Sequence, residues 1–167
     1  LGENPCNVDK IFRRIKQFGG HARQGGGVCG VEMALWDIAG KVAGQPVYEL
    51  LGGWRKKLPA YASTFHGDEN GGLDSPEAFG EFALQCKEMG YPAFKIHGWG
   101  HGPIAREAAA VIATRNAVGS DMDLMIDPGC EYENWGDALK VGKACDEANY
   151  FWYEDPWVSS DLLGLML

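Results

Sequence analysis

The spacing of apolar residues along the chain changes once, near residue 58. Before that point, apolar residues recur at positions 31, 34, 35, 38, 39 and 42, which is the spacing of a helix with one buried face. Glycine-rich breaks separate this segment from its neighbours. The pattern predicts helices at residues 9–18, 31–42 and 46–51.

After residue 58, short apolar runs alternate with helical segments. The runs predict strands at residues 58–65, 93–97, 122–127 and 150–154. Caps and glycines predict helices at residues 75–89, 102–118 and 134–148, and a further cap at residues 159–161. Strands and helices that alternate with a period of about 30 residues indicate right-handed βαβ units, and therefore a parallel sheet.

Charged residues end three of the four predicted strands. Lys95 and His97 end the second strand, Asp127 ends the third and Glu154 ends the fourth. Because the carboxyl ends of parallel strands meet at one edge, these side chains are expected to lie on one rim of the sheet. A doubly wound sheet and a barrel both fit the alternation, and the convergence of the strand ends favours the barrel.

The residue types on this rim suit metal-assisted acid/base chemistry. Asp127 and Glu154 supply the oxygen ligands that a hard divalent cation such as Mg²⁺ prefers. Lys95 and His97 are two positions apart on a strand, so they point to the same face and are candidate proton carriers. A salt bridge between the lysine and the acids would explain the same residues without any function, and the pattern leaves both interpretations open.

Composition narrows the classes of partner. The chain has 167 residues, 46% of them hydrophobic, and a net charge of −8, which argues against nucleic-acid and anionic-membrane partners. No apolar run approaches the roughly 20 residues of a membrane span. Five cysteines without C-x-x-C spacing indicate reduced thiols in a cytoplasmic protein. Cys130 lies near Asp127, but no feature of the sequence activates it, which favours a packing residue over a nucleophile.

Two glycine-rich stretches have alternative interpretations. Residues 25–30 match the dinucleotide motif G-x-G-x-x-G, but a basic helical segment precedes them where that motif needs a strand. A flexible loop that enters a helix is the favoured interpretation, with a nucleotide-binding domain as the weaker alternative. Residues 98–102 follow the second predicted strand and suit either an anion site at the next helix N-terminus or a mobile loop.

Several stretches together resemble one known family. They are GVEMALWDIAGK at 30–41, GQPVYELLGG at 44–53, YAS at 61–63, FKIH at 94–97, LMIDP at 124–128 and YEDP at 153–156. In this order they resemble the enolase superfamily, in particular the mandelate racemase/muconate lactonizing enzyme group, over nearly the whole chain. The resemblance implies the first four strands of a TIM-type (β/α) barrel at 57–167, preceded at 1–56 by the helical end of a capping α+β domain. It also implies that the chain is a fragment of a longer protein.

The resemblance also assigns roles. It implies that Asp127 and Glu154 are two of three Mg²⁺ ligands, that Lys95 binds and polarises the substrate carboxylate, and that His97 carries the α-proton. The further candidates for substrate binding are Tyr61, Ser63 and Trp99. The implied reaction is abstraction of the α-proton of a hydroxy carboxylate through an enediolate. His97 stands where many members have lysine, and some acid-sugar dehydratases have histidine there, which favours dehydration of a sugar acid.

Two alternatives remain beside a dehydratase. One is a racemase or cycloisomerase of the same superfamily. The other is an inactive half-barrel that only associates with other chains, because edge strands near Tyr61 and Phe151 would be unpaired. A homo-oligomer is expected. Gly129 stands where the family often has asparagine, which changes the hydrogen bonding beside Asp127.

Overall fold

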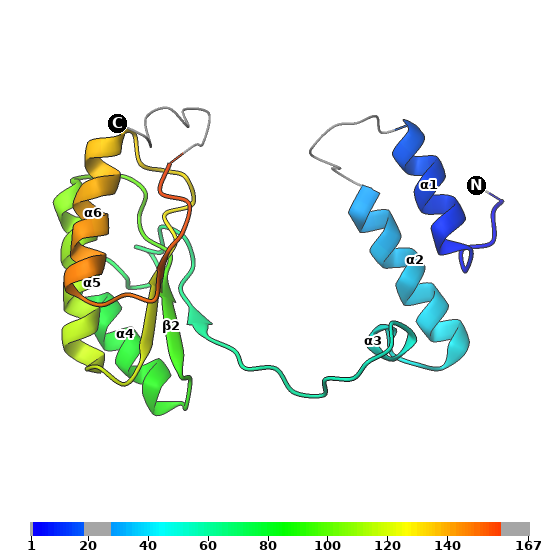
Figure 1. Cartoon of the computed structure of the whole chain (residues 1–167), viewed down its shortest axis with the longest axis horizontal. Helices are drawn as coiled ribbons and strands as arrows, with labels where there is room; N and C mark the ends of the chain where they lie inside the picture. Colours follow the sequence, from blue (N-terminus) through cyan, green and yellow to red (C-terminus); the bar gives the residue numbers. More distant parts are fainter. Residues whose placement is uncertain (1, 19–27, 158–167) are drawn as a thin grey trace. The chain divides into compact units, whose positions relative to one another are not determined.

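A computed structural model describes residues 2–18 and 28–157 and shows two compact units, Leu1–Leu58 and Pro59–Leu167 (Figure 1). The glycines at 25–27 and the predicted helix cap at 159–161 lie outside the described residues. None of the described helices is both long and apolar enough to cross a membrane.

The first unit is helical, as its apolar spacing predicts. Its helices are α1 (Val8–Phe18), α2 (Val28–Ala43) and α3 (Val47–Leu50). Leu35 and Gly40 are the buried residues of α2, whereas Val31, Ile38 and Val42 remain exposed. Within this unit the predicted apolar face of α2 is therefore only partly covered, because so few elements enclose little volume.

The second unit alternates strands and helices. Its elements are β1 (Ala62–Ser63), α4 (Pro76–Glu88), β2 (Ala93–Ile96), α5 (Ile104–Val118), β3 (Asp123–Ile126), α6 (Trp135–Glu147) and β4 (Trp152–Tyr153). The strands lie side by side in sequence order, and every pair is parallel. Helices α4, α5 and α6 all cover the same face of the sheet (Figure 1). A doubly wound sheet would have helices on both faces. The one-sided arrangement therefore confirms the predicted partial (β/α) barrel.

The capping residues of α4 and α6 act as the sequence predicts. Ser75 Oγ accepts a hydrogen bond from Ala78 N at 3.2 Å, with Pro76 as the first helical residue. Asn134 Oδ1 accepts one from Asp137 N at 3.0 Å. These caps satisfy backbone donors at the points where the chain returns from the rim into a helix.

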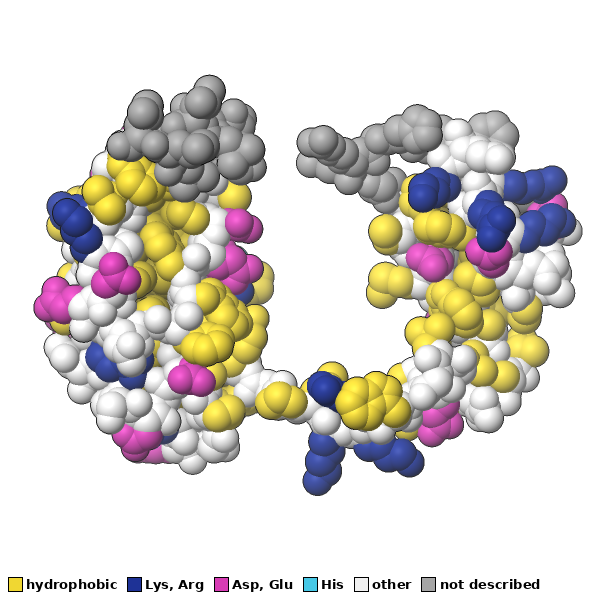
Figure 2. All heavy atoms as spheres, in the orientation of Figure 1, with side chains coloured by type: hydrophobic (Ala, Val, Ile, Leu, Met, Phe, Trp, Pro, Cys, Tyr) yellow, Lys and Arg dark blue, Asp and Glu magenta, His cyan; other side chains and the backbone are white. Residues whose placement is uncertain are grey.

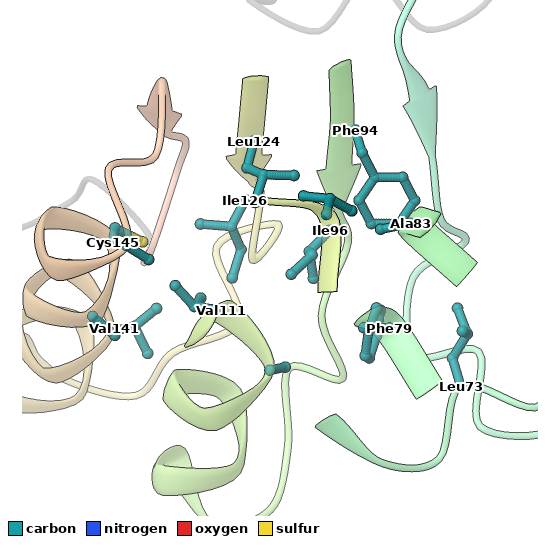
Figure 3. Close-up of a cluster of buried hydrophobic side chains, with 14 of the residues drawn as sticks. Leu73, Phe79, Ala83, Phe94, Ile96, Val111, Leu124, Ile126, Val141 and Cys145 are labelled. Atoms are coloured by element: carbon teal, nitrogen blue, oxygen red, sulfur yellow. The ribbon is translucent and has the colours of Figure 1, made fainter. Parts of the chain in front are cut away.

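Successive side chains of β2 and β3 point to opposite faces of the sheet, one of which faces the core and the other the polar rim. Phe94, Ile96, Leu124 and Ile126 are fully buried and point toward the helices (Figure 3). They pack there against a cluster that includes Phe79, Ala83, Val111, Val141 and Cys145. Because side chains alternate along a strand, Lys95 projects from the opposite face of the sheet.

The two outer strands are shorter than predicted. The run at 58–65 forms a strand only at Ala62–Ser63, and the run at 150–154 only at Trp152–Tyr153. Among the described residues each outer strand pairs with one neighbour, and Phe65 and Phe151 are 81% and 67% exposed. Hydrophobic side chains therefore remain on the surface of this unit on the side away from its helices (Figure 2).

Candidate active site

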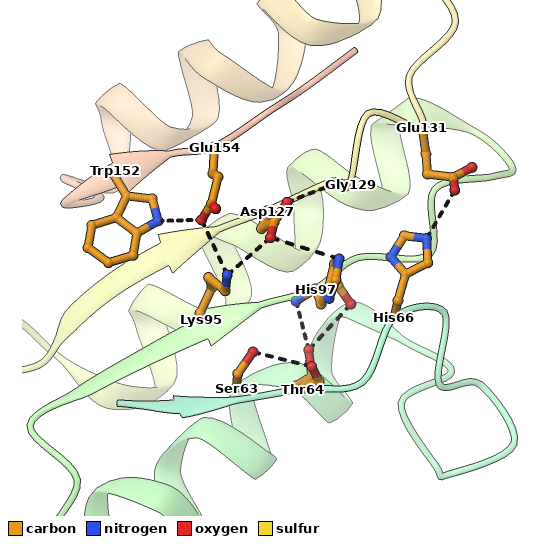
Figure 4. A network of polar contacts seen from close by, with 10 residues as sticks. All are labelled: Ser63, Thr64, His66, Lys95, His97, Asp127, Gly129, Glu131, Trp152 and Glu154. Atoms are coloured by element: carbon orange, nitrogen blue, oxygen red, sulfur yellow. Dashed lines mark hydrogen bonds and ion pairs between the residues drawn. The ribbon is translucent and has the colours of Figure 1, made fainter. Parts of the chain in front are cut away.

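Lys95 lies at the centre of a polar cluster at the carboxyl end of the sheet. Its Nζ donates hydrogen bonds to Asp127 Oδ2 at 3.0 Å and to Glu154 Oε2 at 3.2 Å (Figure 4). The side chains of Lys95 and Asp127 are 12% and 15% exposed, and that of Glu154 is 40% exposed. Three residues that the sequence places on one rim therefore meet there.

The backbone explains why the two carboxylates stand level with each other. Asp127 N donates to Ile96 O, and Glu154 N donates to Ile126 O, so each acid extends the ladder just past its strand. Each carboxylate also has a further donor. Gly129 N donates to Asp127 Oδ1 at 2.9 Å, and Trp152 Nε1 donates to Glu154 Oε2 at 3.2 Å.

The convergence of Asp127 and Glu154 fits a cation site. Both carboxylates reach the same ammonium group, so both have an oxygen beside one positively charged position. Mg²⁺ takes oxygen ligands and usually keeps waters and substrate oxygens as well as one or two carboxylates. In residues 2–18 and 28–157 no group of three or more His, Cys, Asp or Glu side chains is placed to hold a metal ion.

The cluster separates the charge states of its members. Burial lowers the pKa of Lys95, but the hydrogen bonds to Asp127 and Glu154 outweigh it, and the net pKa is raised. Burial raises the pKa of Asp127, but Lys95 and Gly129 N outweigh it, and the net pKa is lowered. At neutral pH, Lys95 is therefore a cation and Asp127 a carboxylate.

His97 is the uncharged basic group beside this ion pair. Its Nε2 lies 4.0 Å from Asp127 Oδ2. Burial lowers the pKa of His97 below its usual value, Asp127 opposes that shift, and His66 and Lys95 add to it. A neutral imidazole next to a permanently charged lysine gives the rim a proton acceptor and a separate cationic group.

Thr64 holds the backbone of His97, and the sequence analysis did not find it. Its Oγ1 accepts a hydrogen bond from His97 N at 2.7 Å and donates to His97 O at 3.3 Å. Its own N–H donates to Lys95 O at 3.1 Å. The side chain is buried, so only the fold reveals that a threonine after β1 fixes the end of β2.

His66 also lies at the rim. Its ring packs at 4.4 Å from the ring of His97, and its Nε2 lies 3.5 Å from Glu131 Oε1 (Figure 4). The rule that selected Lys95 and His97, a polar residue just past a strand, applies equally to His66 after β1. That signal was present in the sequence and was missed.

The three predicted substrate contacts have different positions. The Tyr61 ring lies 5.7 Å from Lys95 Nζ, and Ser63 stands opposite Lys95 in the strand register, so both are at the cluster. Trp99 is only 2% exposed; its Nε1 donates to Leu73 O at 2.6 Å and its ring packs on Phe79. The structure therefore gives Trp99 a core position on the helix side, and a substrate contact by its ring has no support.

A buried carboxylate occupies the glycine-rich loop at 98–102. Glu107 Oε1 accepts hydrogen bonds from Trp99 N at 2.7 Å and Gly100 N at 3.0 Å. These amides are the donors that an external anion would need, so the anion-site interpretation of the loop is not supported. Gly98 permits this approach, because a Cβ there would lie 2.2 Å from Glu107 Oε2.

The surroundings of Cys130 raise the pKa of its thiol, whereas an activated thiol has a lowered pKa. Burial raises its pKa, and the nearby acids Asp155, Asp127 and Glu131 raise it further. A nucleophilic cysteine needs a lowered pKa. The structure therefore agrees with the interpretation of Cys130 as a packing residue.

The buried Glu107 predicts a pH effect on stability. Burial raises its pKa above the usual value, so the folded protein resists ionisation and loses stability as the pH rises through the folded pKa. Glu107→Gln keeps an acceptor for the two amides but carries no charge. The free energy of unfolding of this variant, relative to the wild type, should therefore increase as the pH rises above about 4.5.

Denaturant titrations at several pH values test this prediction. Glu107→Ala, which removes the acceptor, should be less stable than the wild type by about 1–3 kcal/mol at low pH, and the difference should narrow as the pH rises. A constant difference between wild type and Glu107→Gln across the range would show that Glu107 ionises normally in the folded protein.

Two family models match most of the chain. Residues 1–52 match the family described as mandelate racemase/muconate lactonizing enzyme, N-terminal domain, and residues 78–166 match the family described as enolase C-terminal domain-like. The chain therefore belongs to the enolase superfamily, in its mandelate racemase/muconate lactonizing enzyme group, a family of enzymes. The resemblance seen in the sequence motifs is confirmed.

Two curated relatives and one solved structure illustrate the similarity. The chain is 31% identical to arabinonate dehydratase of Saccharolobus solfataricus over 94% of its own length, and 32% identical to D-galactarolactone cycloisomerase of Agrobacterium fabrum over 97%. The crystal structure of D-glucarate dehydratase from Agrobacterium tumefaciens complexed with magnesium matches with a TM-score of 0.84, 34% identity and 98% of this chain. The chain spans 40%, 43% and 45% of the length of these three proteins, respectively.

Proposed function

We propose that the chain forms part of the active site of a Mg²⁺-dependent enzyme that removes the α-proton of a sugar acid and then eliminates water. The observation that carries the proposal is the rim cluster, in which Lys95 Nζ lies between Asp127 and Glu154 while His97 stands 4.0 Å from Asp127. This cluster combines a cation site, a charged lysine and a neutral base. A salt bridge of purely structural character would not need the adjacent neutral histidine.

The proposed first step assigns one role to each group. Lys95, held as a cation, binds a carboxylate oxygen of the substrate. His97 Nε2 accepts the α-proton, and the electron pair of the broken C–H bond moves into the enediolate. Asp127 and Glu154 would hold Mg²⁺, which would supply positive charge to offset the negative charge that develops on the substrate carboxylate.

The proposed second step completes the dehydration. The electron pair of the enediolate forms a carbon–carbon double bond as the C–O bond to the neighbouring hydroxyl breaks. The imidazolium of His97 returns its proton to the departing hydroxyl, which leaves as water. The resulting enol becomes a 2-keto-3-deoxy acid. The chain's own residues thus begin and end the step in the same protonation state.

The choice of a sugar acid rests on similarity and on His97. The chain is similar to arabinonate dehydratase and to D-glucarate dehydratase, which act on such acids by their names. The similarity to D-galactarolactone cycloisomerase supports cycloisomerisation as the second candidate, and racemisation is a third outcome of the same proton abstraction. The product distinguishes these reactions.

A product assay tests the proposal in the natural full-length protein. D-Gluconate, D-galactonate, D-glucarate, galactarate and arabinonate are incubated with the protein and Mg²⁺, and 2-keto-3-deoxy product is measured as its semicarbazone. We expect product from at least one of these acids and none after chelation of the metal. Isomerised acid without keto product would support racemisation, and unchanged acid throughout would contradict both dehydration and racemisation.

The open sheet supports a proposal about assembly. Strands β1 and β4 each have one unpaired edge within the described residues, and apolar residues such as Phe65 and Phe151 are exposed beside them. We propose that these edges are covered by further polypeptide and that the functional protein is a homo-oligomer. Size-exclusion chromatography of the natural full-length protein checks the assembly.

All five cysteines are free thiols, which supports the further proposal of a cytoplasmic location.

A further inference from the structure

We propose that His66 is a positioning residue for His97, oriented by Glu131 and given its space by Gly129. The inference rests on the proposed function, because it concerns the base of that reaction. Thr64 fixes the backbone of His97, but a base must also present its ring in one orientation. The imidazole of His66, packed at 4.4 Å and tilted by 56°, is a neighbour that does this (Figure 4).

Two glycines make the slot in which the His66 ring lies. A Cβ at Gly129 would stand 3.6 Å from His66 Cε1, and a Cβ at Gly100 would stand 3.3 Å from the same atom. Both glycines have positive φ, at +65° and +69°. Backbone therefore borders the ring at these two positions, where a side chain would crowd it, so the glycines leave the room that the ring occupies.

Glu131 determines how His66 is turned within this slot. Its Oε1 lies 3.5 Å from His66 Nε2, so the carboxylate favours a proton on that nitrogen. His66 Nδ1 is buried and has no hydrogen-bond partner among the described residues. An imidazole whose second nitrogen forms no hydrogen bond acts on its neighbour by packing, which is what positioning requires.

Gly129 links this pair to the proposed base. A Cβ at position 129 would lie 3.2 Å from His97 Nε2, closer than an ordinary contact, and 3.9 Å from His66 Nδ1. Both imidazoles thus border the space that a side chain at 129 would enter. Glycine at 129, where the family often has asparagine, therefore leaves room for the rings of both His66 and His97.

Substitution of His66 tests the proposal in the natural full-length protein with Mg²⁺. The substrate is whichever tested sugar acid, such as D-gluconate, gives product. His66→Ala removes the ring and should reduce kcat on the order of 10-fold or more, with KM within about 2-fold, because positioning affects the transition state more than binding. His66→Phe keeps an aromatic ring in the slot and should recover most of the loss. His101→Ala, on the loop after β2, is the matched control and should retain wild-type kinetics.

Gly129→Ala supplies a second, independent test. Alone it should lower kcat, because its Cβ presses on His97 Nε2. In the His66→Ala background the same change should cost several-fold less, since His97 then has room to move. Independent, multiplicative effects of the two changes would overturn the proposal.

A spectroscopic measurement does not depend on activity. With ¹³Cε1-labelled histidine, the ring signal of His97 should shift or broaden in His66→Ala and remain unchanged in His101→Ala. An unchanged His97 signal, or wild-type kcat in His66→Ala, would overturn the positioning role. A His66→Phe variant as impaired as His66→Ala would also overturn it, because a nitrogen of His66 would then act directly. If the proposed function itself is wrong, the wild-type protein will neither bind Mg²⁺ nor give product. That result differs from a failure of the positioning role alone.

Discussion

His97→Ala is expected to abolish measurable exchange of the substrate α-proton with solvent deuterium. A positioned general base contributes roughly 10²- to 10⁴-fold to the rate, so a loss of at least about 100-fold is predicted. The lowered pKa of His97 makes it the neutral acceptor of the rim, while the raised pKa of Lys95 keeps that residue charged and unable to accept a proton. Exchange is followed by mass spectrometry of the sugar acid recovered from deuterated water.

The control for this prediction is metal binding by the same variant. His97 stands 4.0 Å from Asp127 and makes no hydrogen bond to either acidic ligand, so Mg²⁺ affinity should stay close to that of the wild type. Loss of exchange with retained Mg²⁺ affinity assigns His97 to proton transfer. Undiminished exchange in His97→Ala would place the base elsewhere.

Asp127→Asn and Glu154→Gln are each expected to weaken Mg²⁺ binding by at least about 100-fold, close to 3 kcal/mol. Each change keeps the shape of the side chain but removes one of the two negative charges that converge on the cation position. Calorimetric titration of Mg²⁺ into the natural full-length protein measures the loss. The fold should be little affected, because the hydrophobic core lies on the other face of the sheet.

Asp155→Asn is the matched control for the metal prediction. Asp155 directly follows Glu154, is exposed, and has φ of +33°, which asparagine tolerates as well as aspartate does. Its removal changes the net charge by the same amount as Glu154→Gln. If Asp155→Asn weakens Mg²⁺ binding as much as Glu154→Gln, general electrostatics and not ligation would explain the effect.

The parallel order of strands and the rim cluster were accessible from the sequence because both follow from local patterns. Apolar runs, caps and glycines set the alternation of strand and helix. A residue at the carboxyl end of a parallel strand has only one rim to occupy, which is why Lys95, Asp127 and Glu154 meet as expected.

The parts that were missed depend on contacts distant in sequence. Trp99 follows the strand that carries Lys95 and His97, yet it lies in the core, where its Nε1 donates to Leu73 O and its ring packs on Phe79. Thr64 and Glu107 act by hydrogen bonding to backbone that only the fold brings near them. In the described part of the chain each outer strand has one neighbour, and an apolar run does not reveal how many neighbours it will have or how far it will pair.

The most direct test of the central claim is Mg²⁺-dependent exchange of the α-proton in the wild-type protein. The natural full-length protein is incubated in deuterated water with D-gluconate, D-galactonate, D-glucarate, galactarate and arabinonate in turn, first with Mg²⁺ and then with a chelator. For at least one acid we expect either deuterium at the α-carbon or loss of the α-proton through dehydration. Both reactions should occur only while Mg²⁺ is present. Exchange that persists at the same rate after removal of the metal, or Mg²⁺ binding without α-proton chemistry on any of these acids, would contradict the central claim.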